Sequence, residues 1–218
     1  MNYSNKGGYL ELIIGPMFSG KTTKIIEIYN KYKDIFNILV VNYIGDDRYS
    51  TTEIVSHNGI KIPTISLKNL SDIDNNIIYS QKMNDISMII INEGQFFKDI
   101  YEWVKIQTDF YKKNIIVCGL DGDYKREPFT NFIKLIPLAN NIIKVSGVCK
   151  SCADGTPSVF TYRKTNELTQ EVIGTDIYIP VCRTCYLKLE QLKAQNCPNN
   201  YIMPTYHSSA SNYDYSLF

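Results

Sequence analysis

One stretch near the N-terminus constrains the fold of this chain more than any other. Residues 15–22 read GPMFSGKT, a glycine, four residues and then Gly-Lys-Thr, which is the pattern of a phosphate-binding loop. The apolar run before it, residues 10–14, is typical of a buried strand, and residues 22–29 read as a helix. A loop at a helix N-terminus offers free backbone N–H groups and the positive end of the helix dipole. The stretch therefore predicts a polyphosphate site between a strand and a helix.

Each residue of this loop has an expected part in holding phosphates. Lys21 would reach the outer phosphates, and the Thr22 hydroxyl would bind a magnesium ion. A glycine-bearing turn without a ligand is the alternative, but the strand, the loop, the Lys-Thr pair and the helix all agree with the first interpretation. The residues expected to bind phosphate are Gly15, Pro16, Met17, Phe18, Ser19, Gly20, Lys21 and Thr22.

Charge and length exclude several classes of protein. The 218 residues carry 23 basic and 22 acidic side chains, so no overall field attracts nucleic acid or an anionic membrane. We find no N-terminal signal sequence and no apolar run of membrane-spanning length. We therefore expect a cytoplasmic protein with one sizeable domain, or one domain and a small appendage, and with no membrane or nucleic-acid partner.

Further apolar runs alternate with helical stretches and predict the rest of a sheet. Buried strands are expected at residues 37–43, 86–91, 114–120 and 142–145. The amphipathic helix expected at residues 98–113 would bury Ile100, Trp103, Val104, Gln107, Phe110 and Tyr111. Residues 51–66 resemble a hairpin or an exposed edge of the sheet, and residues 67–85 a loop with one short helix. The alternation indicates an α/β fold, a P-loop NTPase-like parallel sheet flanked by helices.

Polar residues follow the strands, at the edge where the ligand crevice of a parallel sheet lies. Asp46, Asp47 and Arg48 follow the second strand, where the arginine could bind phosphate oxygens or only pair with the aspartates in a turn. Asn92 and Glu93 end the third strand, where an acidic residue can hold magnesium-bound water or act as a general base beside the γ-phosphate. These loops should converge on one crevice.

Four of the six cysteines form two CxxC pairs. Cys149 with Cys152, and Cys182 with Cys185, are separated by 29 residues, so an extended excursion is tied off between them. Two such pairs can present four thiolates tetrahedrally to Zn²⁺, which leaves no open position for catalysis. We expect a structural zinc site, with unpaired thiols or a redox pair as the alternatives.

Six motifs occur in order between about residue 10 and residue 192: GPMFSGKTT, NEGQFF, GLDGDYKREPF, VCKSC, VIGTDIY and VCRTC. Together they resemble the zinc-containing, P-loop thymidine kinases of the type II family. The resemblance implies transfer of the ATP γ-phosphate to the 5′-hydroxyl of thymidine or deoxyuridine in nucleotide salvage. It also implies Mg²⁺ with ATP, a small zinc-binding domain with a lasso-like substrate loop, a homotetramer, and inhibition by deoxythymidine triphosphate.

The resemblance also implies roles, position by position. Glu93 matches the catalytic base, which takes the proton of the sugar hydroxyl as the new P–O bond forms. The phosphates held by residues 15–22 would be flanked by Asp46, Asp47, Arg48, Asn92 and Gln95. The pyrimidine would be enclosed by side chains and by a loop backbone that reads the base edge. The residues concerned are Met17, Phe96, Leu120, Tyr124, Phe129, Thr161, Gln170, Glu171, Val172, Ile173, Gly174 and Tyr178.

Three departures from the family pattern bear on function. Asn92 replaces the usual aspartate, Tyr124 replaces a common phenylalanine, and two extra residues precede Thr161. An asparagine can bind magnesium-bound water but brings no charge, so we expect an active enzyme that needs more magnesium. One alternative is an inactive nucleotide sensor, which Asn92 alone supports. Another is a zinc-ribbon ATPase acting on nucleic acid, although few basic residues surround the cysteines.

Four segments are expected along the chain. Residues 1–8 would be flexible, residues 9–147 the nucleotide-binding domain, residues 148–195 the zinc-binding and lasso domain, and residues 196–218 a disordered tail. The tail is rich in Asn, Ser and Tyr without periodicity, which is the basis for the last expectation.

Overall fold

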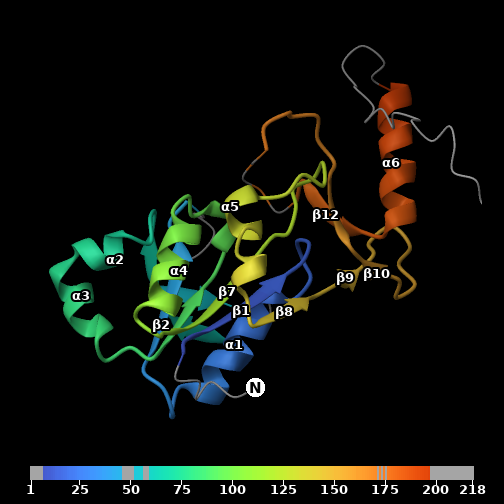
Figure 1. Cartoon of the computed structure of the whole chain (residues 1–218). Coiled ribbons are helices and arrows are strands. Elements are labelled where there is room, and N and C mark those ends of the chain that lie inside the picture. Colours follow the sequence, from blue (N-terminus) through green and yellow to red (C-terminus); the bar gives the residue numbers. More distant parts are fainter. Residues whose placement is uncertain are drawn as a thin grey trace, which may run out of the picture.

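The structure is a computed structural model, and it describes residues 7–45, 52–55, 59–170, 172, 174 and 176–196. A larger α/β part is followed by a smaller part that ends in the long helix α6, Arg183–Asn196 (Figure 1). None of the helices in the described ranges is long and apolar enough to cross a membrane.

Parallel strands form a six-stranded central sheet in the order β5-β2-β6-β7-β1-β8. Their bounds are Tyr9–Ile14 for β1, Ile38–Tyr43 for β2, Ile65–Leu67 for β5, Met88–Ile91 for β6, Asn114–Gly119 for β7 and Asn141–Lys144 for β8. This confirms the predicted parallel α/β fold. β5 is not among the predicted strands, because three residues between polar segments are too few to show a strand period.

Helices and a hairpin cover the two faces of this sheet. The elements are α1 (Lys21–Tyr32), β3 (Glu53–Val55), β4 (Lys61–Pro63), α2 (Asp72–Asn75), α3 (Ile77–Met83), α4 (Ile100–Asp109), α5 (Thr130–Ile133) and the 3₁₀ segments Gly94–Phe96 and Ile136–Leu138. On one face α2, α3, α4 and α5 contribute side chains to the apolar cluster that contains Ile115 and Val117 of β7. On the other, α1 and the β3–β4 hairpin pack in the cluster that contains Ile116 and Cys118. Side chains alternate along a strand, so successive residues of β7 enter the clusters on opposite faces of the sheet. β7 is therefore buried on both faces.

The segments between the strands differ from expectation in two places. α4 ends at Asp109, so Phe110 and Tyr111 leave the helical period and are 76% and 55% exposed. Their predicted burial is wrong, whereas the rest of the predicted stripe is buried. The hairpin is confirmed, but residues 67–85 contain two short helices, the second capped by the Asn76 side chain.

Residues after β8 build a smaller unit with its own core. It contains β9 (Gly147–Val148), β10 (Pro157–Ser158), β11 (Phe160–Arg163), β12 (Tyr178–Val181) and α6. β9 pairs with β10, and β11 with β12, both antiparallel. The core consists of Cys149, Tyr162, Val181, Cys182 and Tyr186. The sequence also predicts a strand at residues 158–162 and a short helix at residues 185–195, and β11 and α6 confirm them. The proposed boundary at residue 147 remains a prediction, and residues 1–6 and 197–218 lie outside the described ranges.

Candidate active site

The loop that is predicted to bind phosphates lies between the end of β1 and the start of α1. Gly15 is required there by a close approach, since a Cβ atom would lie 2.3 Å from the carbonyl oxygen of Val145. Gly20, directly before α1, has φ of 81°, a left-handed conformation that favours glycine. The sequence therefore places its two glycines where other residues would distort the loop.

Lys21 is the buried cation of this loop. Its Nζ donates to the carbonyl oxygens of Gly15 (3.1 Å) and Pro16 (2.7 Å), and the side chain curls back into the loop. Burial lowers the pKa of the Lys21 ammonium, while Cys118, Glu93 and Asp121 act in the opposite direction. A desolvated ammonium held by two carbonyl groups is a suitable partner for an incoming anion, as a polyphosphate would be.

Asn92 and Glu93 leave the end of β6 at the same edge of the sheet. Asn92 is buried, and its Nδ2 donates to Oδ1 of Asn42 (2.9 Å), whereas its own Oδ1 has no hydrogen-bond partner among the described residues. An amide oxygen is a hard ligand, so this unpartnered group fits Mg²⁺ or a magnesium-bound water. The chemistry of Asn92 is therefore compatible with the expected magnesium site.

The carboxylate of Glu93 is held by Gln95. Gln95 Nε2 donates to Glu93 Oε2 (2.7 Å), and Gln95 Oε1 accepts from the backbone N–H of Leu120 (3.0 Å) at the end of β7. Glu93 itself has φ of 53°, an uncommon conformation for a non-glycine residue and one found at functional sites. One buried amide thus links the candidate base to the neighbouring strand.

The phosphate loop contacts the smaller unit directly. The backbone N–H of Met17 donates to Oγ1 of Thr161 on β11 (2.9 Å). Beside it, a Cβ on Gly147 would lie 2.6 Å from the carbonyl oxygen of Phe18, so the two backbones pass very close. Residues that are 144 positions apart in the sequence therefore meet at the predicted phosphate site.

The aromatic residues predicted for the base are brought together in two groups. The ring centroids of Phe96 and Phe129 are 6.3 Å apart, and Leu120 packs against the apolar cluster that contains Phe129. Tyr124 donates its hydroxyl to the carbonyl oxygen of Glu167 (3.2 Å), and the hydroxyl of Tyr178 donates to the carbonyl oxygen of Val172 (3.1 Å). The second group, Tyr124 and Tyr178, thus contacts the segment around residues 167–172, which includes part of the loop predicted to enclose the substrate.

Arg163, which is not among the predicted site residues, contacts both members of that second group. Its guanidinium carbon lies 3.7 Å from the centroid of the Tyr124 ring, and its Nη2 donates to the Tyr178 hydroxyl (2.8 Å). No motif marks this arginine. Strand alternation was the one available signal, since residues 161 and 163 share a face of β11.

Some predicted residues cannot be placed. Asp46, Asp47, Arg48, Glu171 and Ile173 lie outside the described ranges, and their roles stay predictions.

The four paired cysteines meet in space. One Sγ atom from each lies within 4.8 Å of the others, and Cys152 Sγ is 3.8 Å from Cys182 Sγ and 3.4 Å from Cys185 Sγ. Zn–S bonds of about 2.3 Å in a tetrahedron place sulfur atoms about 3.8 Å apart. The backbone N–H groups of Cys152 and Cys182 donate to Cys149 Sγ at 3.4 and 3.3 Å. The donor set fits a four-coordinate metal such as zinc.

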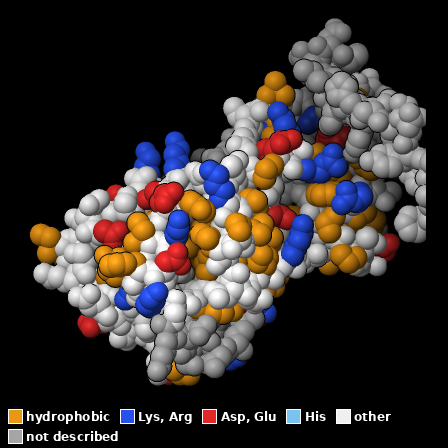
Figure 2. Space-filling model, in the orientation of Figure 1, with side chains coloured by type: hydrophobic (Ala, Val, Ile, Leu, Met, Phe, Trp, Pro, Cys, Tyr) orange, Lys and Arg blue, Asp and Glu red, His pale blue; other side chains and the backbone are white. Residues whose placement is uncertain are grey.

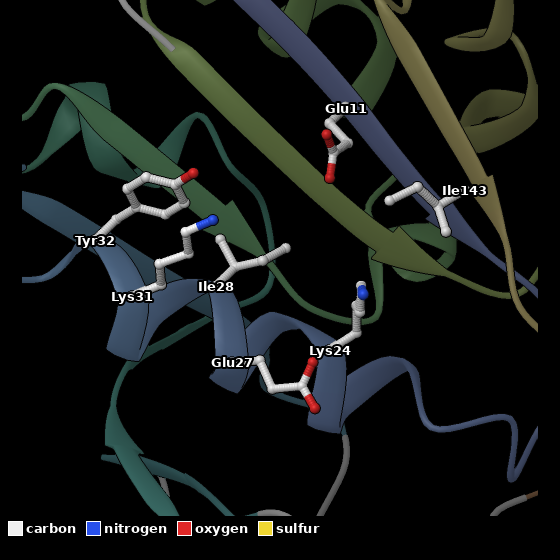
Figure 3. A pocket seen from close by; sticks show the side chains of 7 residues that line it. All are labelled: Glu11, Lys24, Glu27, Ile28, Lys31, Tyr32 and Ile143. Atoms are coloured by element: carbon white, nitrogen blue, oxygen red, sulfur yellow. The ribbon is translucent and has the colours of Figure 1, made fainter. Parts of the chain in front are cut away.

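A separate hollow lies beside α1, and no residue predicted for the active site lines it (Figure 3). Glu11 of β1 is buried there. Its Oε2 accepts from the Tyr9 hydroxyl and from Asn141 Nδ2, both at 3.1 Å, and its Oε1 has no partner within the described part of the chain. Lys24 and Lys31 of α1 also line this hollow.

Comparison with known proteins identifies the family. A family model described as thymidine kinase matches residues 8–186. The chain belongs to the thymidine kinase family. This family member is 37% identical over 188 residues to the thymidine kinase of Yaba monkey tumor virus (strain VR587), covering 85% of this chain and 98% of that protein. It is 37% identical over 183 residues to the thymidine kinase of Vaccinia virus (strain Western Reserve), covering 83% and 98%. It is 36% identical over 183 residues to the thymidine kinase of Oryza sativa subsp. japonica, covering 83% and 66%.

Proposed function

We propose that this chain transfers the γ-phosphate of ATP to the 5′-hydroxyl of thymidine, and of deoxyuridine, in pyrimidine nucleotide salvage. Membership of the family supports the reaction. The structural observation that carries the proposal is the hydrogen bond from Met17 to Thr161, because it joins the phosphate loop to β11. β11 directly precedes the segment between β11 and β12, residues 164–177, which is called the lasso from here on. A kinase must hold donor and acceptor in one cavity, and this contact brings the two candidate sites together.

In this mechanism Glu93 accepts a hydrogen bond from the 5′-hydroxyl and takes its proton as the P–O bond forms. Gln95 keeps the carboxylate oriented through the 2.7 Å hydrogen bond described above. Lys21 and the backbone N–H groups of residues 18–22 stabilise the charge on the transferring phosphoryl group. Thr22 and Asn92 would hold Mg²⁺, which neutralises the charge of the triphosphate when bound.

The nucleoside would lie between the loop and the smaller unit. We assign its enclosure to the predicted residues: Met17, Phe96, Leu120, Tyr124, Phe129, Thr161, Gln170, Glu171, Val172, Ile173, Gly174 and Tyr178. Asp46, Asp47 and Arg48 would flank the phosphates. Flat aromatic walls suit a pyrimidine, and backbone groups of the lasso can read its edge.

The proposal includes structural zinc at the four cysteines, a homotetramer, inhibition by deoxythymidine triphosphate and a cytoplasmic location. The cysteine geometry supports a metal of this kind. The other features rest on the resemblance to the family. A nucleic-acid partner is not supported by the face drawn in Figure 2, where acidic and basic side chains are mixed rather than gathered into a basic stripe.

The test is a labelled-ATP assay with each deoxynucleoside at saturating magnesium. We expect thymidine and deoxyuridine to be phosphorylated, and Glu93→Gln to lower turnover by about 10²- to 10⁴-fold because a positioned general base is lost. Glu102→Gln, the same change on an exposed position of α4, is the matched control and should keep full turnover.

Absence of a thymidine 5′-monophosphate product from the wild-type protein would reject the proposed function. ATP binding without any product would then favour the inactive sensor, and ATP hydrolysis stimulated by DNA would favour the nucleic-acid ATPase. Equal turnover by wild type and Glu93→Gln would remove only the role of Glu93.

A further inference from the structure

Arg163 carries a charge inside the protein, and its surroundings suggest why. The side chain is 1% exposed and is the largest fully buried side chain in the described structure. It lies two residues after Thr161 on β11, so both side chains point to the same face of the strand, while Tyr162 points to the cysteine core. One face of β11 therefore holds the phosphate loop through Thr161 and meets the lasso through Arg163.

The guanidinium group donates to a series of backbone carbonyls in the lasso. Nη1 donates to the carbonyl oxygens of Glu167 (2.9 Å) and Thr169 (2.6 Å), and Nη2 donates to that of Gln170 (2.7 Å). Nε and Nη2 both donate to the Tyr178 hydroxyl, at 3.2 and 2.8 Å. A planar fork of fixed donors thus sets where these loop carbonyls lie.

Aromatic rings complete the environment of Arg163. At 3.7 Å from the ring centroid, the guanidinium carbon covers one face of Tyr124, and it lies 5.2 Å from the centroid of Tyr178. The Tyr124 hydroxyl donates to the carbonyl oxygen of Glu167, which also accepts from Arg163. The lasso and both tyrosines are therefore joined through a single side chain.

Burial of the charged Arg163 side chain costs free energy of desolvation. No carboxylate lies within ion-pairing distance of Arg163 within the described ranges, and that of Glu167 acts on it only from farther away. Carbonyl dipoles and ring faces therefore make the direct contacts with its charge. An apolar side chain could fill the same volume without this desolvation penalty, but it could not orient three carbonyl groups. The cost is consistent with a requirement for one defined loop path.

We propose that Arg163 is the positioning residue of the nucleoside site, holding the lasso backbone in register with Tyr124 and Tyr178. The inference rests on the proposed function for its substrate, a pyrimidine nucleoside. Arg163 does not touch the reacting phosphate, so its loss should weaken nucleoside binding far more than ATP binding or the chemical step.

Steady-state kinetics test this with Arg163→Met, Arg163→Lys and a matched control. We expect Arg163→Met to raise the KM for thymidine by at least about tenfold, with kcat and the KM for ATP within about threefold of wild type. Arg163→Lys keeps the charge but lacks the planar fork of donors, so its KM for thymidine should lie between those of wild type and Arg163→Met. Arg126→Met removes another guanidinium stacked on a ring, that of Tyr186 at 4.6 Å, and should leave the thymidine KM unchanged. An unchanged thymidine KM in Arg163→Met, or an equal loss in all three parameters, would overturn the proposal.

Hydrogen exchange gives a readout that needs no kinase activity. Amides of peptides covering residues 164–177 should exchange faster in Arg163→Met than in wild type, while α1 peptides and zinc content stay the same. Unaltered exchange would overturn the proposal even if the wild type phosphorylates thymidine. Conversely, if the wild-type protein fails to phosphorylate thymidine, the proposed function is rejected, and hydrogen exchange still tests whether Arg163 orders the lasso.

Should Arg163→Met fail to fold, Tyr178→Phe decides the question. It keeps the ring and removes only the hydroxyl that accepts from Arg163 and donates to Val172. A several-fold rise in thymidine KM with faster lasso exchange supports the proposal, and wild-type values for both contradict it.

Discussion

The large sheet and the smaller unit are held together by different kinds of interaction. In the sheet, β7 is buried along its whole length, and two apolar clusters pack against its opposite faces. The smaller unit has a core of five residues, two of which are cysteines of the candidate metal site. Around that core lie directional contacts of the Arg163 guanidinium with backbone carbonyls and aromatic rings.

This difference has consequences for how each region fails. Apolar packing is non-directional and shared among many side chains, so its loss is graded. A metal site or a guanidinium fork depends on every partner being in place, so removal of one member leaves others unsatisfied. The large sheet should therefore tolerate substitutions that the smaller unit does not.

The largest effect is expected from Cys149→Ser. Cys149 is fully buried and its sulfur accepts two backbone N–H groups, so its loss should abolish the proposed zinc binding. Thymidine turnover should fall about a thousandfold or more, because structural zinc contributes roughly 10 kcal/mol or more to folding of small metal-dependent units. Zinc analysis measures the loss of the metal, and circular dichroism and ATP binding check that the sheet remains folded.

Cys118→Ser is the matched control for that experiment. Cys118 lies in an apolar cluster of the sheet, so this variant should lose some stability and keep its zinc. Wild-type zinc content and turnover in Cys149→Ser would break the comparison between the two regions.

A cavity in the sheet should give the next largest effect, of the graded kind. Leu12 of β1 is fully buried in one apolar cluster, and Leu12→Ala should lower the free energy of unfolding by about 2–5 kcal/mol. Zinc content and the thymidine KM should stay near wild type. Urea unfolding measures the change, with Leu192→Ala on α6, 46% exposed, as a control expected to cost about 0.5 kcal/mol or less. Loss of zinc in folded Leu12→Ala would contradict the independence of the two regions.

Asn92→Asp should have a smaller effect, confined to magnesium dependence. The new carboxylate would bring a charge to the position where the Asn92 Oδ1 has no hydrogen-bond partner among the described residues, and the Asn42 amide can rotate to donate to it. We expect half-maximal activity at several-fold lower magnesium, measured by titration at saturating ATP and thymidine. Identical magnesium curves and turnover for the variant and wild type would exclude Asn92 from the metal site.

The smallest effect is expected at alkaline pH. Burial, then Glu11, raises the pKa of Tyr9 to about 12 from its ordinary value of 10.0. Because the folded pKa is the higher one, this contribution to stability is present below about pH 10 and is lost as the pH rises toward 12. Tyr9→Phe should flatten the loss of stability over that window, measured by urea unfolding. Tyr111→Phe, an exposed tyrosine, serves as the control, and equal slopes for both variants would remove the explanation.

Local patterns accounted for most of the fold. Long apolar runs predicted five of the six sheet strands, since continuous burial of a strand leaves a continuous run of Ile, Leu and Val. The short β5 and the early end of α4 were not predictable in this way. Three residues show no period, and a stripe does not reveal where the chain leaves the helix.

The candidate site divides along the same line. The phosphate loop, the acidic residue after β6 and the two cysteine pairs are short motifs whose spacing is itself the signal. Arg163 lies in no motif, and the NEGQFF motif does not reveal that Gln95 links Glu93 to the neighbouring strand. Their significance comes from contacts with Thr169 and Leu120, which other segments of the chain supply.

The sequence by itself indicated the parallel sheet, the phosphate loop and the four-cysteine cluster, because each is marked by short local patterns: apolar runs, the Gly-Lys-Thr loop and the two CxxC pairs. Only the tertiary structure decided that Met17 would meet Thr161 and that one buried arginine would join the lasso to two tyrosines. Hydrogen bonds between distant segments depend on how the sheet and the smaller unit pack against each other. That packing has no local signature in the order of the residues.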